Sequence, residues 1–208
     1  VRVTLRGPLR NGYRGLDHVH NGRAETNPEQ YGPELYVDFL CRFMEQSHRR
    51  EQPFFAFYSM ALAHDVTDDL PTQVPYQPGK KRWMNYGEMI VSMDAMVGKL
   101  VAKLDQLGLR ENTVIFFTGD NGTAVRSKLS YLPNGKYRVE RVFSVRNGKP
   151  VFGGKGTLGD AGTKVPLIAN WPAKIKPGSR TATLVDSSDW LPTLAEIGGV
   201  KVERHIDG

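Results

Sequence analysis

A carboxylate and a carboxamide stand side by side directly after a short apolar run in the middle of the chain. The run covers residues 114–117, and the polar pair is Asp120-Asn121, followed by Gly122. In an open α/β sheet, ligands bind beyond the carboxyl ends of the strands, where this pair is expected to lie. Carboxylate and carboxamide oxygens suit a hard cation such as Ca²⁺ or Mg²⁺. Because Asp-Asn-Gly is also a common turn sequence, the pair alone leaves both interpretations open.

Two further positions offer cationic side chains. His64 follows an aromatic run, and Lys155 lies within Gly153-Gly154-Lys155-Gly156. The glycines allow the backbone to approach a ligand closely and hold a single ammonium in place, which suits a tetrahedral oxyanion. The spacing is not that of a phosphate-binding Walker loop. Taken singly, His64 is also explained as a loop histidine bonded to backbone, and Lys155 as part of a solvated turn.

The periodicity of apolar residues predicts the elements that must position these side chains. We expect helices over residues 33–48, 83–107 and 188–197, and strands over residues 53–60, 114–118 and 165–171. Strand–helix–strand order favours a mostly parallel sheet flanked by helices, with a right-handed crossover. Residues 1–30 show no period and are interpreted as loop. Turn signals at Pro133-Asn134-Gly135 and Asn147-Gly148 predict an inserted hairpin over residues 123–150, beside the site.

Two single residues are assigned to helix ends, and one to a helix face. Gly108 is expected to end the long helix, and Asp189 to cap or charge the start of the last one. Cys41 is the one cysteine of the chain, so no internal disulfide is possible. It falls on the face of the first helix, which indicates a buried, inert thiol.

Composition bounds the class of protein. The 208 residues suffice for one α/β domain or most of a larger one. The formal charge of +6 is spread along the chain without a nucleic-acid-binding motif, so no nucleic-acid partner is predicted. No apolar run approaches the ~20 residues that a membrane-spanning helix needs, so no membrane span is predicted.

The order of the motifs resembles that of the sulfatase family, within the alkaline-phosphatase-like superfamily. The segments that carry the resemblance are Pro53–Tyr58 with Ala63-His64, Leu104–Thr113, Phe117–Gly122, Gly154–Thr157, Gly162–Ile168 with Trp171-Pro172, and Asp189–Leu194 with Asp207-Gly208. The run Gly159-Asp160-Ala161-Gly162 resembles the sequence of an arylsulfatase-like subgroup at this position. Each motif is weak or moderate alone, whereas their joint order and spacing cover nearly the whole chain.

The resemblance implies a role for each candidate site residue. Asp120 and Asn121 would bind a divalent cation, usually Ca²⁺, with Mg²⁺ also possible. Lys155 and His64 would contact the sulfate, because fixed cations stabilise the charge that builds on its oxygens. His64 could also donate a proton to the leaving alkoxide. The implied reaction is hydrolysis of a sulfate ester, and the implied partner is a sulfated small molecule or glycan.

Several parts of the family's active site are not found in the sequence. The family's nucleophile is a formylglycine made from Cys or Ser in a Cys/Ser-x-Pro/Ala-x-Arg motif. Cys41 is followed by Arg42-Phe43-Met44 and does not fit. We therefore expect residues 1–208 to be the middle and C-terminal part of a catalytic domain, incomplete at its N-terminal side, with the nucleophile and the other metal ligands upstream of Val1. Such a fragment alone would be inactive, and family habit implies a periplasmic or extracellular location.

Two alternatives remain open. A relative from the same superfamily would hydrolyse phosphate or phosphonate esters, and a sulfatase-like pseudoenzyme would bind sulfated glycans through its basic surface. The segment 123–150 is rich in basic residues, namely Arg126, Lys128, Lys136, Arg138, Arg141 and Arg146. These residues either meet an anionic substrate at the pocket mouth or form a solvated basic hairpin.

Overall fold

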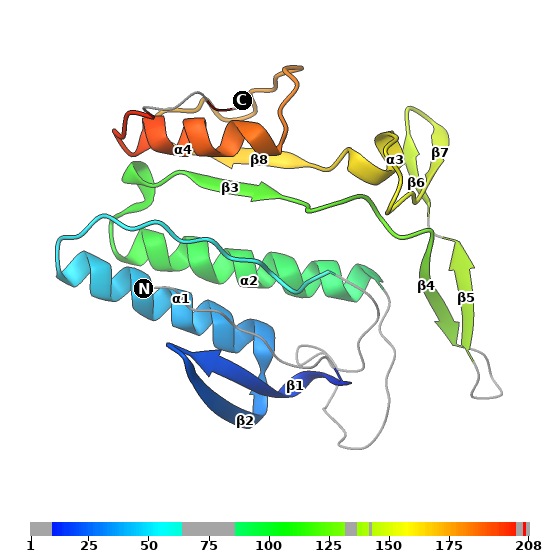
Figure 1. Ribbon diagram of the computed structural model, residues 1–208, viewed down its shortest axis with the longest axis horizontal. Helices are drawn as coiled ribbons and strands as arrows, with labels where there is room; N and C mark the ends of the chain where they lie inside the picture. The colour runs from blue at the N-terminus through cyan, green and yellow to red at the C-terminus, as the bar shows by residue number, and fades with distance from the viewer. Residues whose placement is uncertain (1–9, 64–85, 132–136, 142, 203–205, 207–208) are drawn as a thin grey trace. The chain divides into compact units, whose positions relative to one another are not determined.

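The computed structural model describes residues 10–63, 86–131, 137–141, 143–202 and 206 (Figure 1). The chain divides into two compact units, residues 1–173 and residues 174–208, which are described separately. The first half of the larger unit contains β1 (Arg10–His20), β2 (Arg23–Tyr31), α1 (Gly32–Arg49) and α2 (Tyr86–Gln106). Its second half contains a 3₁₀ turn η1 (Arg110–Asn112), β3 (Ile115–Thr118), β4 (Arg126–Tyr131), β5 (Tyr137–Arg141), β6 (Phe143–Arg146), β7 (Lys149–Phe152), α3 (Asp160–Thr163) and β8 (Leu167–Asn170).

Strands β1 and β2 form an antiparallel hairpin where the sequence predicted a loop. The turn between them is Asn21-Gly22, with φ of 50° and 83° and His20 paired with Arg23. Two residues with positive φ joining two strands match the type I′ turn that Asn-Gly favours. The prediction of loop was wrong for residues 10–30, because it relied on apolar periodicity and overlooked this turn signal, whereas residues 1–9 lie outside the described residues.

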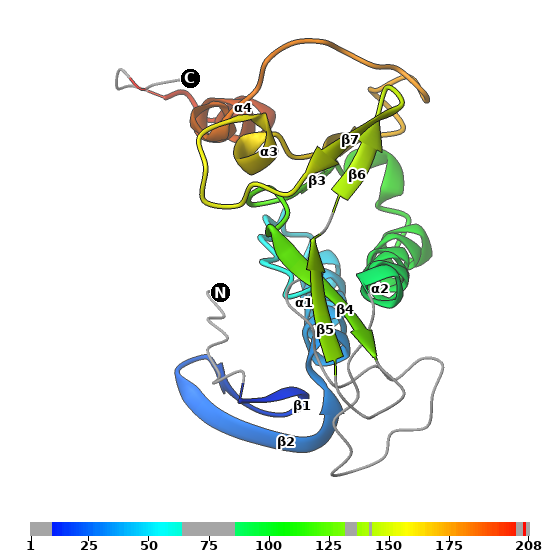
Figure 2. The same ribbon diagram turned by 90° about the vertical axis from the view of Figure 1, so that its right-hand side faces the viewer.

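Helices α1 and α2 pack side by side, as both ribbon views show (Figures 1 and 2). Their apolar stripes supply most of the fully buried side chains, including Val37, Met89, Met96 and Leu104. Glu34 at the start of α1 accepts a hydrogen bond from the Lys99 ammonium at 3.0 Å. Both helices lie where the apolar spacing placed them, within three residues at each end.

The long helix ends as expected. Gly108 has a φ of +68°, its amide donates to the Asp105 carbonyl, and the Leu109 amide donates to the Leu104 carbonyl. This pair of bonds is the Schellman arrangement, and the left-handed conformation that it requires favours glycine.

The predicted strand over residues 53–60 is not observed. Phe54 packs edge-on against Phe43 with ring centroids 5.9 Å apart, whereas Phe55 and Phe57 are exposed. In the described part of the chain no strand pairs with this segment. Its aromatic composition favours a strand, but a strand also needs a hydrogen-bonded neighbour. The end of the segment does pack, since Leu62 forms a small core with Tyr31 and Met89.

Strand β3 pairs with β8, and the pair is antiparallel, with Ile115 opposite Asn170 and Thr118 opposite Leu167. All strand pairs among the described residues are antiparallel, so the expected parallel sheet is not found there. A parallel pair needs a crossover connection, usually a helix. The connection from β3 to β8 instead carries the hairpins β4–β5 and β6–β7 and the four-residue α3, and the chain returns antiparallel.

The smaller unit holds a 3₁₀ turn η2 (Ser187–Asp189) that leads into α4 (Trp190–Ile197). Asp186 caps η2 by accepting a bond from the Ser188 amide at 2.7 Å. Asp189 stands at the N-cap position of α4, as expected, but its side chain makes no capping bond to that helix. Hydrogen bonds from the Ser188 hydroxyl and amide hold the pKa of Asp186 below its usual value. Asp189 completes a capping box by accepting from the Asp186 amide. No helix among the described residues is long and apolar enough to cross a membrane.

Candidate functional site

The loop after β3 presents the carboxylate and the carboxamide that the sequence singled out. The Asn121 amide donates to Asp120 Oδ1 at 2.9 Å, and the Asn121 side-chain nitrogen donates to the Gly122 carbonyl at 3.2 Å. These bonds fix both side chains locally. They engage one Asp120 oxygen and the Asn121 nitrogen. Within the described part of the chain, the second Asp120 oxygen and Asn121 Oδ1 make no hydrogen bond and could bind a ligand. Asp120 is exposed and Asn121 is half-buried.

Backbone hydrogen bonds join this loop to the lysine loop and to α3. The Gly122 amide donates to the Gly162 carbonyl at 2.7 Å. The amides of Gly154 and Lys155 both donate to the Thr123 carbonyl, at 2.9 and 3.0 Å. The structure therefore brings the Asp120-Asn121 loop together with the Lys155 loop and with α3, in three bonded segments, residues 119–123, 153–157 and 159–163. We call these three segments the glycine junction.

Glycine is required at the contacts of the glycine junction. A Cβ on Gly122 would overlap the Ala161 carbonyl, and a Cβ on Gly162 would overlap the Thr157 carbonyl. A Cβ on Gly154 would lie 2.7 Å from the Ala161 Cβ. Because the obstructing atoms are mostly backbone, they cannot rotate away as a flexible side chain would. The glycines of the sequence motifs thus act by close approach of backbone to backbone.

Two hydrogen bonds to one carbonyl fix the turn that carries Lys155. The amide and the hydroxyl of Thr157 both donate to the Gly154 carbonyl, at 2.9 and 2.8 Å. Gly156 has a φ of +88° and sits at the tip of the turn. The Lys155 side chain is exposed and has no ion pair with any other described residue. A fixed backbone with an unneutralised ammonium is suited to an anionic group.

One of the two acidic side chains of the junction, Asp160, is paired with two basic residues other than Lys155. Asp160 at the start of α3 lies 3.7 Å from the Arg146 guanidinium and 3.6 Å from the Lys164 ammonium. These exposed pairs contribute little stability. The Asp160 carboxylate is thus paired with Arg146 and Lys164 and not with Lys155.

Asp120 and Asn121 fit a hard divalent cation as two of its ligands. Both offer oxygen atoms, which Ca²⁺ and Mg²⁺ prefer, but Ca²⁺ takes six to eight oxygens. Among the described residues no third His, Cys, Asp or Glu completes a metal cluster. His64 lies outside the described residues, so its expected contact with the sulfate stays a prediction.

The sequence reasoning missed Thr123. Its carbonyl accepts two of the backbone bonds that hold the lysine loop, yet its side chain plays no part in them. Any residue type supplies such a carbonyl, so no sequence signal marks the position.

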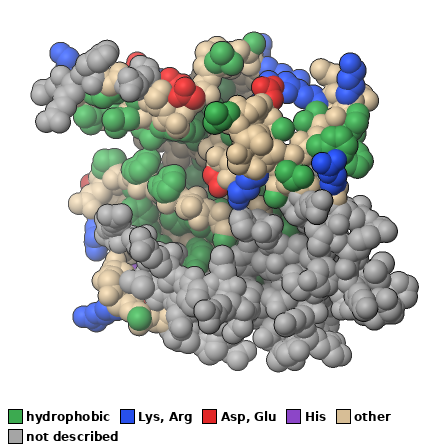
Figure 3. Space-filling model, turned by 45° about the vertical axis from the view of Figure 1, so that its right-hand side comes forward, with side chains coloured by type: hydrophobic (Ala, Val, Ile, Leu, Met, Phe, Trp, Pro, Cys, Tyr) green, Lys and Arg blue, Asp and Glu red, His purple; other side chains and the backbone are tan. Residues whose placement is uncertain are grey.

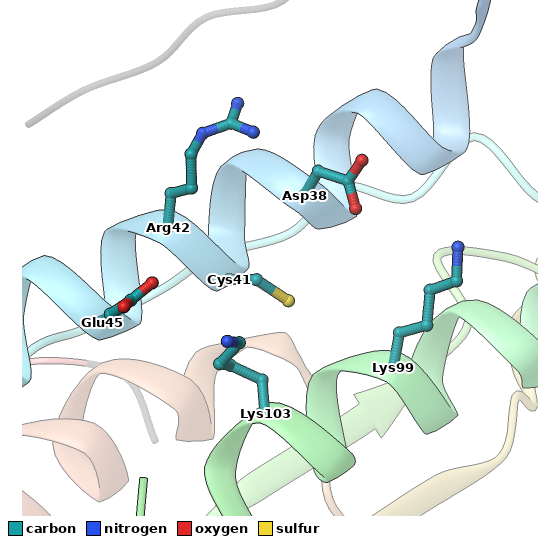
Figure 4. Close-up of a pocket in the computed structure, with 6 residues that line it drawn as sticks. All are labelled: Asp38, Cys41, Arg42, Glu45, Lys99 and Lys103. Atoms are coloured by element: carbon teal, nitrogen blue, oxygen red, sulfur yellow. The ribbon is translucent and has the colours of Figure 1, made fainter. Parts of the chain in front are cut away.

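A hollow lies between α1 and α2 and is lined by charged side chains around Cys41 (Figure 4). Its lining residues are Asp38, Cys41, Arg42, Glu45, Lys99 and Lys103. Burial raises the pKa of the half-buried Cys41 thiol, and Lys103 and Lys99 oppose that shift. A raised pKa disfavours the reactive thiolate. The thiol is half-buried, whereas the sequence predicted a buried one.

Comparison with known proteins identifies relatives of this chain. The sulfatase family model matches residues 10–200. The chain is 32% identical to N-acetylgalactosamine-6-sulfatase of Mus musculus over 193 residues, which are 91% of this chain and 33% of that protein. It is 31% identical to steryl-sulfatase of Mus musculus, over 87% of this chain and 27% of that protein.

A solved structure also resembles this chain in its fold. The crystal structure of Ps i-CgsB in complex with k-i-k-neocarrahexaose matches with a TM-score of 0.68 and 25% identity, covering 92% of this chain and 40% of that one. The chain spans about a third of the length of the curated relatives named above. The order of the motifs, the family match and the fold all agree, and the chain belongs to the sulfatase family.

Proposed function

We propose that this chain supplies one half of the active site of an enzyme that hydrolyses sulfate esters. The observation that carries the proposal is the pair of backbone bonds that the Gly154 and Lys155 amides donate to the Thr123 carbonyl, which join the Lys155 loop to the Asp120-Asn121 loop. These bonds join residues that are 31 and 32 positions apart in the sequence. Family membership supports the reaction class.

Lys155 would bind and orient the sulfate. Its ammonium is exposed and unpaired among the described residues, and its backbone is fixed at both Gly154 and Thr157. During cleavage of the ester, negative charge builds on the peripheral and bridging oxygens of the sulfate. A preorganised cation stabilises that charge without the cost of reorganising at the moment of reaction.

Asp120 and Asn121 would hold a divalent cation, Ca²⁺ or Mg²⁺, as two of its ligands. The cation would supply Lewis-acid polarisation of the sulfate oxygens. The hydrogen bond from the Asn121 amide to Asp120 Oδ1 orients the carboxylate for this role. His64 would contact the sulfate and protonate the leaving oxygen, as the family resemblance implies.

The nucleophile and the remaining metal ligands are proposed to lie in residues that precede this chain in the complete gene product. The proposed nucleophile is a formylglycine. Because the chain covers only about a third of the relatives' length, the activity of the whole protein is itself part of the proposal. An extracytoplasmic location is proposed on the family resemblance alone.

The substrate is proposed to be a sulfated small molecule or saccharide. The relatives are named for N-acetylgalactosamine-6-sulfate and steryl sulfate esters, and the matching crystal structure contains an oligosaccharide, k-i-k-neocarrahexaose. Their names cover both sugar and non-sugar esters, so the class of substrate has to be tested on this protein.

The test compares Lys155→Ala with Lys174→Ala in the product of the complete reading frame. Hydrolysis of 4-nitrophenyl sulfate should fall about 10²–10³-fold in kcat when Lys155 is removed, as for loss of one preorganised donor to a developing anion. Lys174 is exposed and lies outside the junction, so its removal should leave the rate unchanged. Removal of divalent cations by a chelator should abolish the activity, and added Ca²⁺ or Mg²⁺ should restore it.

Three results would contradict the proposal. The first is absence of sulfate ester hydrolysis by the metal-loaded wild-type protein, which would favour a pseudoenzyme. The second is faster hydrolysis of 4-nitrophenyl phosphate than of the sulfate, which would favour a phosphoryl-transfer relative. The third is an unchanged rate in Lys155→Ala.

A further inference from the structure

The hairpin β6–β7 exposes its apolar face. Phe143 pairs with Phe152 and Val145 pairs with Pro150, and the alternation of side chains along a strand places these residues on one face. All are exposed, with exposed fractions of 58% for Phe143, 68% for Val145 and 48% for Phe152. The opposite face carries Arg146, which reaches Asp160 on α3. We call the exposed face, formed by Phe143, Val145, Pro150 and Phe152, the hairpin platform.

The hairpin platform is bordered by positive charge. The Arg141 guanidinium carbon lies 5.4 Å from the centroid of the Phe152 ring, and the rings of Phe143 and Phe152 lie 6.1 Å apart. Residues 141–159 contain four basic and no acidic side chains. Figure 3 shows hydrophobic and basic side chains next to one another on the face that comes forward there. The ligand that such a surface fits has a flat apolar side and negatively charged groups.

The hairpin platform adjoins the proposed sulfate site through the chain itself. Strand β7 ends at Phe152, and Lys155 follows three residues later on the pinned turn. Three residues span at most about 10 Å, so a ligand in contact with Phe152 lies within two sugar rings of the Lys155 backbone. The hairpin platform and the Lys155 turn are therefore close neighbours along the chain.

The area of the hairpin platform argues for a small ligand. A fully buried aromatic side chain contributes roughly 150–250 Å². Two half-exposed rings, one valine and one proline therefore offer much less than the ~800 Å² per partner of a stable protein interface. The area matches one or two sugar rings.

We propose that the hairpin platform is a subsite for an anionic, sulfated saccharide chain whose scissile sulfate lies at Lys155. The rings of Phe143 and Phe152 pack against the C–H face of a sugar, and Arg141 binds a sulfate group on the same or the adjoining sugar. This inference rests on the proposed function, because it assigns the substrate class of that site. The platform takes no part in the chemistry and determines which esters are held.

The experiment uses the product of the complete reading frame in three forms, namely wild type, the double variant Phe143→Ser/Phe152→Ser, and Arg141→Gln. Leu184→Ser and Arg180→Gln serve as matched controls, because both residues are exposed and lie in the other unit. For each protein, kcat/KM is measured on a sulfated oligosaccharide and on 4-nitrophenyl sulfate. Binding of the oligosaccharide and of its desulfated form is measured by calorimetry.

The proposal expects a selective loss. Each platform variant should lower kcat/KM on the oligosaccharide about tenfold and weaken its binding to the same degree, as truncation of an aromatic or arginine anchor does. The rate on 4-nitrophenyl sulfate, and both controls, should stay within twofold of wild type. Arg141→Gln should weaken binding of the sulfated form more than that of the desulfated form.

Other results overturn the inference. An equal fall on both substrates would mean that the hairpin supports the fold or the reacting groups, and a fall on 4-nitrophenyl sulfate alone would mean that the platform holds an aryl group. Unchanged oligosaccharide kinetics and binding in the variants would show that the hairpin platform is not a subsite. If no sulfate ester is hydrolysed at all, the proposed function fails. The binding measurement then still decides the subsite, which stands if the variants weaken binding and falls if they do not or if wild type does not bind.

Discussion

The glycine junction and the α1–α2 helix pair hold their parts together by different means. In the junction, loops meet through backbone bonds such as Gly122 to Gly162, with no side chain between them. In the helix pair, each helix contributes buried side chains, such as Val37 on α1 and Met96 on α2. Added side-chain volume should therefore destabilise the junction, whereas lost side-chain volume should destabilise the helix pair.

The largest effect is expected where a methyl group enters the junction. In Gly122→Ala, the new Cβ would overlap the Ala161 carbonyl and separate the Gly122 amide from Gly162. Overpacking costs about 1–3 kcal/mol and a buried unpaired amide a similar amount, so we expect a loss of about 4 kcal/mol in local stability. Hydrogen exchange of the Gly154 and Lys155 amides should accelerate, and sulfate ester hydrolysis should fall by more than tenfold.

The control for that substitution lies in the same junction. Gly159→Ala adds the same methyl group at a φ of −79°, where no atom lies within 4 Å. Exchange rates and hydrolysis should match wild type. Equal damage by both substitutions would show that close backbone approach is not what requires glycine at position 122.

The next largest effect is expected from lost volume in the helix pair. Met96 is 1% exposed, and Met96→Ala should lower the free energy of unfolding by about 3 kcal/mol through lost burial and a residual cavity. Val91 on the same helix is 57% exposed, so Val91→Ala should change the free energy by less than about 0.5 kcal/mol. Urea denaturation followed by circular dichroism measures both values. Similar losses for the two variants would contradict the assignment of the helix interface.

The two regions also differ in how far the sequence revealed them. Apolar spacing predicted α1 and α2, because the residue types along a helix determine which of its faces is buried. Gly108 marked the end of α2. The bonds of the junction run to the carbonyl of Thr123, a group that every residue type possesses. Only the order of glycine-rich motifs indicated that these loops belong to one site.

Strands were predicted least well, because pairing depends on a partner elsewhere in the chain. Residues 53–60 have the composition of a strand but no strand neighbour among the described residues. Strands β1 and β2 lack apolar alternation, yet they pair across Asn21-Gly22. The turn chemistry was the better guide there, as it also was at Asn147-Gly148, where both φ values are positive.

A gain of stability is expected when a methyl group is added to the helix pair in place of the junction. Gly98 lies inside α2 and is exposed, with open space where its Cβ would be. Gly98→Ala should raise the free energy of unfolding by about 1 kcal/mol, because alanine has the higher helix propensity. Measured beside Gly122→Ala, the same chemical change should show opposite signs. A loss in both variants would break the contrast between the two regions.

The smallest effect concerns the charged hollow of the helix pair. Burial raises the pKa of Cys41, whereas the nearby Lys103 lowers it. Alkylation of Cys41 by iodoacetamide, followed by mass spectrometry of its peptide, should therefore reach half its maximal rate at a higher pH than for free cysteine. Lys103→Gln removes a positive charge that stabilises the thiolate, so the midpoint should move further upward, whereas Lys174→Gln should leave it in place. A midpoint below that of free cysteine would instead make Cys41 a reactive thiol, and the helix pair would then hold chemistry as well as structure.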